Sequence, residues 1–398
     1  MLTVRDKSGN GVSRWHKGTL GMLLAGCLFA AEDPELAALA ELSDLPPLPN
    51  WMVTASVSVA GGYRDNILLS PTNPVGSTLL RGEFETMFLR VPVNAWDGYV
   101  FVNGAETRFL SADQTDHERT VFVVSELRWQ PNESWKATLL GQGYHHDQVF
   151  DVSATEVDFA TAALKVTGFV LAPSLRWKFL PQTWVEVKAL GRQDSYDRDV
   201  DGYREGEGSV KIGQEWGDGS EVVLGAARRW RAHDSREQYT VGGRPIFGSL
   251  LKVQQTEATL RVTWAVDAAK RWKFGATLLH EENRDNGTGY FDYNRQQLTA
   301  DMTWRAEPWE LRFAAAAAEY EFPVQEIGIG ITPEIRRKSD RRVTVELTRK
   351  INETWTAFGL VEVERARSND ERSRFRSATG YAGIRWSWDG LAKTIEEL

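Results

Sequence analysis

The 398-residue sequence contains a single cysteine, Cys27, so no disulfide bond can form within the chain. It contains no apolar run of about twenty residues, which excludes an ordinary transmembrane helix. No glycine-rich phosphate loop, cysteine pair or helical His–Glu motif is present. The formal net charge of −8 leaves no basic face for a nucleic-acid partner. A soluble protein and a transmembrane β-barrel both remain, because alternating hydropathy keeps the average hydropathy of a barrel low.

Tryptophan is abundant by contrast, and its positions distinguish these two classes. All of the 16 tryptophans except Trp15 and Trp230 lie beside short turns or at the two ends of one long β-rich region. Indole rings partition to the level of lipid headgroups, where transmembrane barrels carry aromatic girdles. The predicted membrane-interface residues are Trp129, Trp135, Trp177, Trp216, Trp264, Trp272, Trp304, Trp309, Trp355, Trp386 and Trp388.

From Trp51 onward, apolar and polar residues alternate with a period of two, as in strands with one lipid-facing side. The pattern predicts an all-β fold, a transmembrane antiparallel up-and-down β-barrel of about 16 strands spanning residues 51–388. Short turns, the first of them at 93–98, alternate with longer charged connections. An even strand number keeps both termini periplasmic. One strand departs from the pattern, because Trp184 shares its parity with Glu186 and Lys188.

The residues flanking the barrel predict its compartment. Residues 1–31 have a basic start and a short apolar core, which is typical of a secretory signal peptide. Cys27 lies in a segment that resembles the lipobox of bacterial lipoproteins, and it is either lipidated or part of a discarded signal peptide. Residues 32–50 predict a short periplasmic helix with a proline-rich spacer, and 389–398 a periplasmic tail.

The parity opposite the apolar one predicts the lumen. Both signs of charge alternate along it, which indicates a hydrated channel, a network of cross-strand ion pairs that stiffens the wall, or both. The predicted lumen-lining residues are Arg128, Arg176, Lys188, Lys211, Arg229, Arg231, Arg261, Lys273, Arg295, Asp301, Arg312, Glu346, Glu362 and Arg385. Three segments are candidates to constrict the channel: 151–161, 235–251 and 323–336.

No catalytic residue, metal site or cofactor is predicted. His145 and His146 point to opposite faces of a strand and cannot share a metal ion. His280 and His233 have acidic neighbours in the sequence, but any polar rim offers such a neighbourhood. The chain is therefore not expected to be an enzyme.

The girdle and the alternation together resemble porin-type barrels of Gram-negative outer membranes. The segment Gly61–Ser70 resembles the opening of surface-lipoprotein assembly modifier and exosortase-associated barrels. The leading hypothesis is an outer-membrane pore for passive diffusion of small hydrophilic solutes or ions. The alternatives are an export or assembly barrel for polysaccharide or surface lipoprotein that works with periplasmic partners, and a purely structural barrel. The expected partners are outer-membrane lipid, the barrel-assembly machinery and further copies of the chain.

Overall fold

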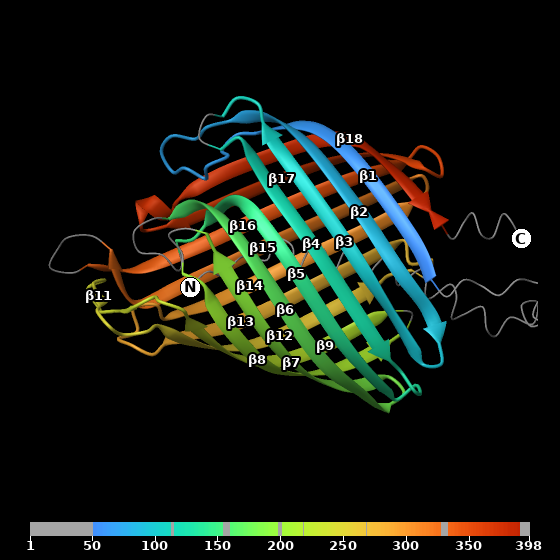
Figure 1. Ribbon diagram of the computed structural model, residues 1–398, viewed down its shortest axis with the longest axis horizontal. Helices are drawn as coiled ribbons and strands as arrows, with labels where there is room; N and C mark the ends of the chain where they lie inside the picture. The colour runs from blue at the N-terminus through green and yellow to red at the C-terminus, as the bar shows by residue number, and fades with distance from the viewer. Residues whose placement is uncertain are drawn as a thin grey trace, which may run out of the picture.

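A computed structural model describes residues 51–112, 115–153, 160–197, 201–217, 219–267, 269–327 and 333–390. Its main element is a closed antiparallel barrel of sixteen strands, which confirms the predicted fold class (Figure 1). Within the described ranges, no helix has the length and apolar character needed to cross a membrane. The predicted signal peptide with Cys27, the periplasmic helix at 32–50 and most of the tail at 389–398 lie outside the described residues.

The strands follow one another around the barrel in sequence order, and β1 closes the wall by pairing with β18. The first eight wall strands are β1 Trp51–Arg64, β2 Ser77–Val93, β3 Trp96–Phe109, β4 His117–Trp129, β5 Trp135–Asp151, β6 Thr161–Leu180, β7 Thr183–Tyr196 and β8 Tyr203–Trp216. The other eight are β9 Ser220–His233, β12 Lys252–Ala265, β13 Trp272–Asp285, β14 Tyr293–Ala306, β15 Trp309–Ile327, β16 Glu334–Lys350, β17 Trp355–Ser368 and β18 Phe375–Asp389. A small hairpin, β10 Gln238–Tyr239 and β11 Pro245–Ile246, lies between β9 and β12.

The connections divide into short turns at one end of the barrel and longer loops at the other, as predicted. The first turn is shorter than the predicted 93–98, because Asn94 and Ala95 both adopt positive φ angles (52° and 70°). A two-residue turn of this kind matches the twist of a hairpin, so β3 already begins at Trp96. The long-loop end carries the β10–β11 hairpin, at the left of Figure 1.

The two faces of the wall differ as the alternation predicted. In β1, Val57 and Val59 are exposed on the outside, whereas Ser58 and Ala60 are buried on the inside. Tryptophans of neighbouring strands meet in register at the short-turn end, where Trp96 lies opposite Trp129 and Trp135 opposite Trp177. Trp135 and Trp177 stack with ring centroids 5.7 Å apart. A belt of indoles therefore surrounds the short-turn rim on the outside of a largely apolar wall.

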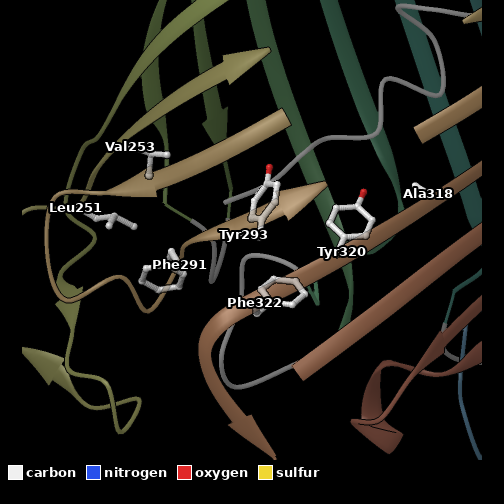
Figure 2. Close-up of a cluster of buried hydrophobic side chains, with 7 residues drawn as sticks. All are labelled: Leu251, Val253, Phe291, Tyr293, Ala318, Tyr320 and Phe322. Atoms are coloured by element: carbon white, nitrogen blue, oxygen red, sulfur yellow. The ribbon is translucent and has the colours of Figure 1, made fainter. Parts of the chain in front are cut away.

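Apolar side chains also gather inside the barrel toward the long-loop end. One cluster comprises Leu251, Val253, Phe291, Tyr293, Ala318, Tyr320 and Phe322 (Figure 2). A second cluster on β4, β5 and β6 includes Phe122, Tyr144, Phe150 and Leu164. These side chains occupy space that would otherwise be lumen, so the long-loop half of the barrel is packed more fully than the short-turn half.

Candidate functional site

All fourteen predicted lumen residues lie on the parity that faces the barrel interior. Most of them form ion pairs with neighbouring strands. Arg229 of β9 contacts Glu207 of β8 and, at 3.1 Å, Glu257 of β12. Arg128 lies 3.2 Å from Asp97 of β3. Arg312 of β15 reaches Glu346 of β16 at 3.9 Å. The geometry thus contains the cross-strand network that the sequence suggested, and such pairs stiffen a wall by roughly 0.2–1 kcal/mol each.

Five of the predicted lumen cations have no such partner among the described residues, namely Arg385 of β18 and four that lie close together in the strand order. Within the described part of the chain, no carboxylate oxygen lies within 4.0 Å of the charged groups of Lys188, Lys211, Arg261 or Lys273. They lie on β7, β8, β12 and β13, which with β9 form one contiguous sector of the wall. This sector therefore holds four lumen cations that no contacting carboxylate neutralises.

Trp184 resolves the exception that the sequence showed on β7. Its indole is 2% exposed and lies inside the barrel, not in the girdle. The guanidinium of Arg176 stacks 3.8 Å from its ring centroid, and Arg176 also binds Glu186 at 2.9 Å. A Cβ atom at Gly213 of β8 would lie 2.3 Å from the indole, so only glycine leaves room for the ring here. The parity of Trp184 in the sequence was a correct signal of this inward position.

The buried acid Asp194 binds three side chains in the long-loop half of the wall. Its side chain is fully buried and accepts hydrogen bonds from the hydroxyls of Tyr144 and, at 2.6 Å, Tyr203. Arg192, two residues away on the same strand, binds it at 2.6 Å. Next to it, Arg231 binds Glu205 at 2.5 Å and lies 4.0 Å above the ring of Tyr203. This cluster was missed, although the shared parity of Arg192 and Asp194 was a usable signal.

Opposite walls meet at the long-loop end. Lys338 of β16 donates to Asp151 at the end of β5 over 2.6 Å, and both side chains are at most 10% exposed. In the strand order of the barrel, β5 and β16 are seven steps apart one way and nine the other. Arg336 donates to the backbone oxygen of Ser153 at 2.7 Å. We define the four residues Asp151, Ser153, Arg336 and Lys338 as the cross-lumen contact.

The cross-lumen contact joins two of the three segments predicted to constrict the channel, 151–161 and 323–336. Near the third segment, Leu251 contributes to the cluster in Figure 2, where Tyr293 and Tyr320 stand side by side. A fourth inward segment was not predicted. In the loop after β1, Ile67 and Leu69 are at most 2% exposed, and Leu69 packs against Val149 of β5.

A pocket of about 80 Å³ lies beside the cross-lumen contact. Its lining includes Ser153, Tyr290, Gln325, Arg336, Asp370 and Arg372. Burial raises the pKa of the Tyr290 hydroxyl in the loop after β13. Burial also acts to raise the pKa of Asp370, but hydrogen bonds from Arg372 outweigh it and leave that pKa below its ordinary value. Near neutral pH the pocket therefore combines a neutral phenol with a charged Asp370–Arg372 pair.

The histidines of the described residues lie apart from one another or on opposite faces of the wall. His280 is exposed on the outer face, 3.7 Å from Glu282, whereas the adjacent Glu281 is buried on the inner face. His233 lies inside, 3.8 Å from Asp201. Across the described ranges, no three His, Cys, Asp or Glu side chains are placed to share a metal ion.

The closed sixteen-strand wall, the apolar outer face with its indole belt and the charged interior define the chain as a porin-like β-barrel of the Gram-negative outer membrane. The sequence matches no protein-family model, and it matches no curated protein.

Several solved outer-membrane proteins have a similar architecture. OccAB1 of Acinetobacter baumannii is 9% identical, with a TM-score of 0.46 over 85% of this chain and 96% of that chain. A BenF-like porin from Pseudomonas fluorescens Pf-5 is also 9% identical, with a TM-score of 0.43 over 85% and 99% of the two chains. OccK9 (OpdG) of Pseudomonas aeruginosa is 11% identical, with a TM-score of 0.43 over 85% and 98%.

Proposed function

We propose that this barrel is a pore through which small hydrophilic solutes and ions diffuse across the outer membrane. The observation that carries the proposal is the contrast between the two faces of one wall. Inside the short-turn half, charged residues such as Lys211 and Arg261 are partly exposed, whereas the outer face at the same levels is apolar. Charged side chains favour such positions when water fills the interior, and a sixteen-strand barrel is wide enough to hold that water.

The unpaired cations supply a preference among solutes. Lys188, Lys211, Arg261 and Lys273 lie in one sector of the wall, and no carboxylate contacts their charged groups in the described part of the wall. Rings or rows of basic side chains favour anions in a pore, because they lower the electrostatic energy of a passing negative charge. We therefore expect anions, including small carboxylates, to pass more readily than cations of similar size.

Planar-bilayer recording tests the pore itself. The purified full-length protein is expected to give discrete conductance steps that increase with KCl concentration, because a hydrated lumen conducts bulk ions. A barrel that shows the heat-modifiable gel mobility of a folded outer-membrane protein and yet never conducts would contradict the proposal. The same preparation then serves for the selectivity measurement.

The four unpaired lumen cations predict the direction of ion selectivity. Under a KCl gradient, the reversal potential of the wild-type protein is expected to indicate a preference for chloride. The triple variant Lys188→Gln, Lys211→Gln, Lys273→Gln should shift the reversal potential toward potassium. A matched triple variant, Arg108→Gln, Arg119→Gln, Lys165→Gln, removes as many positive charges from the outer face and should leave it unchanged. Equal shifts in both variants would show that the charge of the whole protein, not its lumen, sets the selectivity.

A further inference from the structure

A row of arginines crosses the outer face of the last three strands, β16, β17 and β18 (orange to red in Figure 1). Arg341 of β16 lies directly opposite Arg365 of β17, and Arg365 lies directly opposite Arg376 of β18. All three are exposed and share the outward parity. Arg337 and Arg367 lie on the same face, nearer the long-loop end. We call these five residues the arginine patch.

The arginine patch has no compensating acid. Within the described residues, no carboxylate oxygen lies within 4.0 Å of its guanidinium groups. Glu319 and Glu321 of β15 face the same side, with Glu321 opposite Arg337, but neither forms an ion pair there. Like charges directly opposite each other destabilise a sheet. Three adjacent strands therefore carry a repulsive arrangement that the described protein does not neutralise.

Outward cations on the other side of the barrel are arranged differently. Arg108 and Arg119 bind Glu106 at 2.8 and 3.0 Å, and Lys165 lies 3.6 Å from Asp147. These residues also lie near the long-loop ends of their strands, on β3, β4 and β6. The β16–β18 face thus differs from the β3–β6 face, where the outward cations are paired with acids.

The distance of the patch from the tryptophan girdle shows which layer of the membrane surrounds it. Ten residues separate Trp355 from Arg365, and ten separate Trp386 from Arg376. At ~3.3 Å per residue and a tilt of about 40°, this is a vertical distance of about 25 Å, the height of the apolar band of an outer-membrane barrel. The row therefore lies at the outer edge of that band, level with the headgroups of the outer leaflet.

The surface below the row suits lipid chains. Between Arg365 and Trp355, the outward residues of β17 are Val363, Val361, Gly359 and Ala357. Ala378, Gly380 and Ala382 follow Arg376 on β18. These residues are apolar and mostly small, so an acyl chain can approach the backbone closely. The face thus combines cations at headgroup level with a surface of mostly small apolar side chains toward the membrane centre.

We propose that the arginine patch binds the phosphorylated headgroup of an anionic glycolipid in the outer leaflet, with its acyl chains against β17 and β18. Guanidinium forks bind phosphate oxygens in pairs and keep their charge at any physiological pH. Strands lie about 4.8 Å apart, so Arg341 and Arg376 are separated by about 10 Å, which lets phosphate groups lie between neighbouring arginines. The bound phosphates neutralise the repulsion along the row.

Native mass spectrometry of the full-length protein in detergent, titrated with bisphosphorylated lipid A, tests this site. The triple variant Arg341→Gln, Arg365→Gln, Arg376→Gln is expected to bind lipid A about tenfold more weakly than the wild type. The matched variant Arg108→Gln, Arg119→Gln, Lys165→Gln should bind it like the wild type. A third variant, Arg341→Lys, Arg365→Lys, Arg376→Lys, should retain part of the affinity, because it keeps the charge and loses the bidentate geometry.

Each other outcome contradicts the proposal. Equal affinity of the patch variant and the wild type for lipid A would show that the arginine patch is not the binding site. An equal loss of affinity in both glutamine variants would show non-specific electrostatic attraction. Displacement of lipid A by inorganic phosphate identifies a free-anion site instead. A patch variant that changes oligomeric state while it retains lipid A shows an interface between copies of the chain. Heat-modifiable gel mobility establishes that each variant is folded, and channel conductance is not used as a readout, so this test is independent of the proposed pore.

Discussion

An Asp194→Ala variant is expected to lose about 3–5 kcal/mol of unfolding free energy, because removing one partner leaves a buried ion pair uncompensated. Asp194 is fully buried and accepts hydrogen bonds from two tyrosine hydroxyls and from Arg192, whose side chain is 19% exposed. Without the carboxylate, the guanidinium has no acid in contact, and the hydroxyls of Tyr144 and Tyr203 lose their acceptor. The loss should appear as a lower denaturant midpoint in detergent micelles, followed by tryptophan fluorescence.

Two further variants separate this mechanism from a general effect of mutation. Asp194→Asn keeps an acceptor for the hydroxyls but removes the charge, so its stability should fall between wild type and Asp194→Ala. Asp267→Ala removes an exposed turn carboxylate that binds Arg271 at 2.8 Å, and it should leave the midpoint close to that of the wild type. If Asp194→Ala and Asp267→Ala had the same small effect, the buried cluster would not stabilise the barrel.

The architecture could be predicted because it follows from local periodicity. A period of two reports which side chains share a face, and the indoles report where the wall meets the headgroups, so fold class and strand number were both correct. Trp184 shows how far this reasoning reaches, because it shares its parity with Glu186 and Lys188 and proves to lie inside the barrel. Strand ends were less accurate, as at Trp96, since the positive φ angle of Ala95 could not be anticipated from its side chain.

The features that depend on pairing across the barrel could not be predicted. Parity places Lys338 inside and Arg365 outside, but it does not say which residue lies opposite either one. The arginine patch requires the register of three strands, and the cross-lumen contact requires that β5 bend inward toward a strand seven steps away. Register and closure are set by the whole sheet together, so such contacts become visible only in three dimensions.

The double variant Asp151→Ala, Lys338→Ala is expected to raise the single-channel conductance several-fold. The wild-type pair joins opposite walls at 2.6 Å, and conductance is limited by the narrowest cross-section of the lumen. Removing both partners avoids leaving either member of this pair buried without the other. Asp340, 3.5 Å from Lys338, loses that contact in the variant, so heat-modifiable gel mobility should establish that the wall is folded.

A matched control keeps the number of removed charges constant. Glu106→Ala, Arg119→Ala deletes an ion pair of 3.0 Å between the neighbouring strands β3 and β4 on the outer face, and should leave the conductance unchanged. Planar-bilayer recordings of the three proteins in the same KCl solution give the comparison. If the Asp151→Ala, Lys338→Ala variant conducted like the wild type, the narrowest point of the lumen would lie elsewhere. The next position to test would be the cluster of Leu69, Val149 and Phe375, which also packs side chains from separate parts of the barrel against one another.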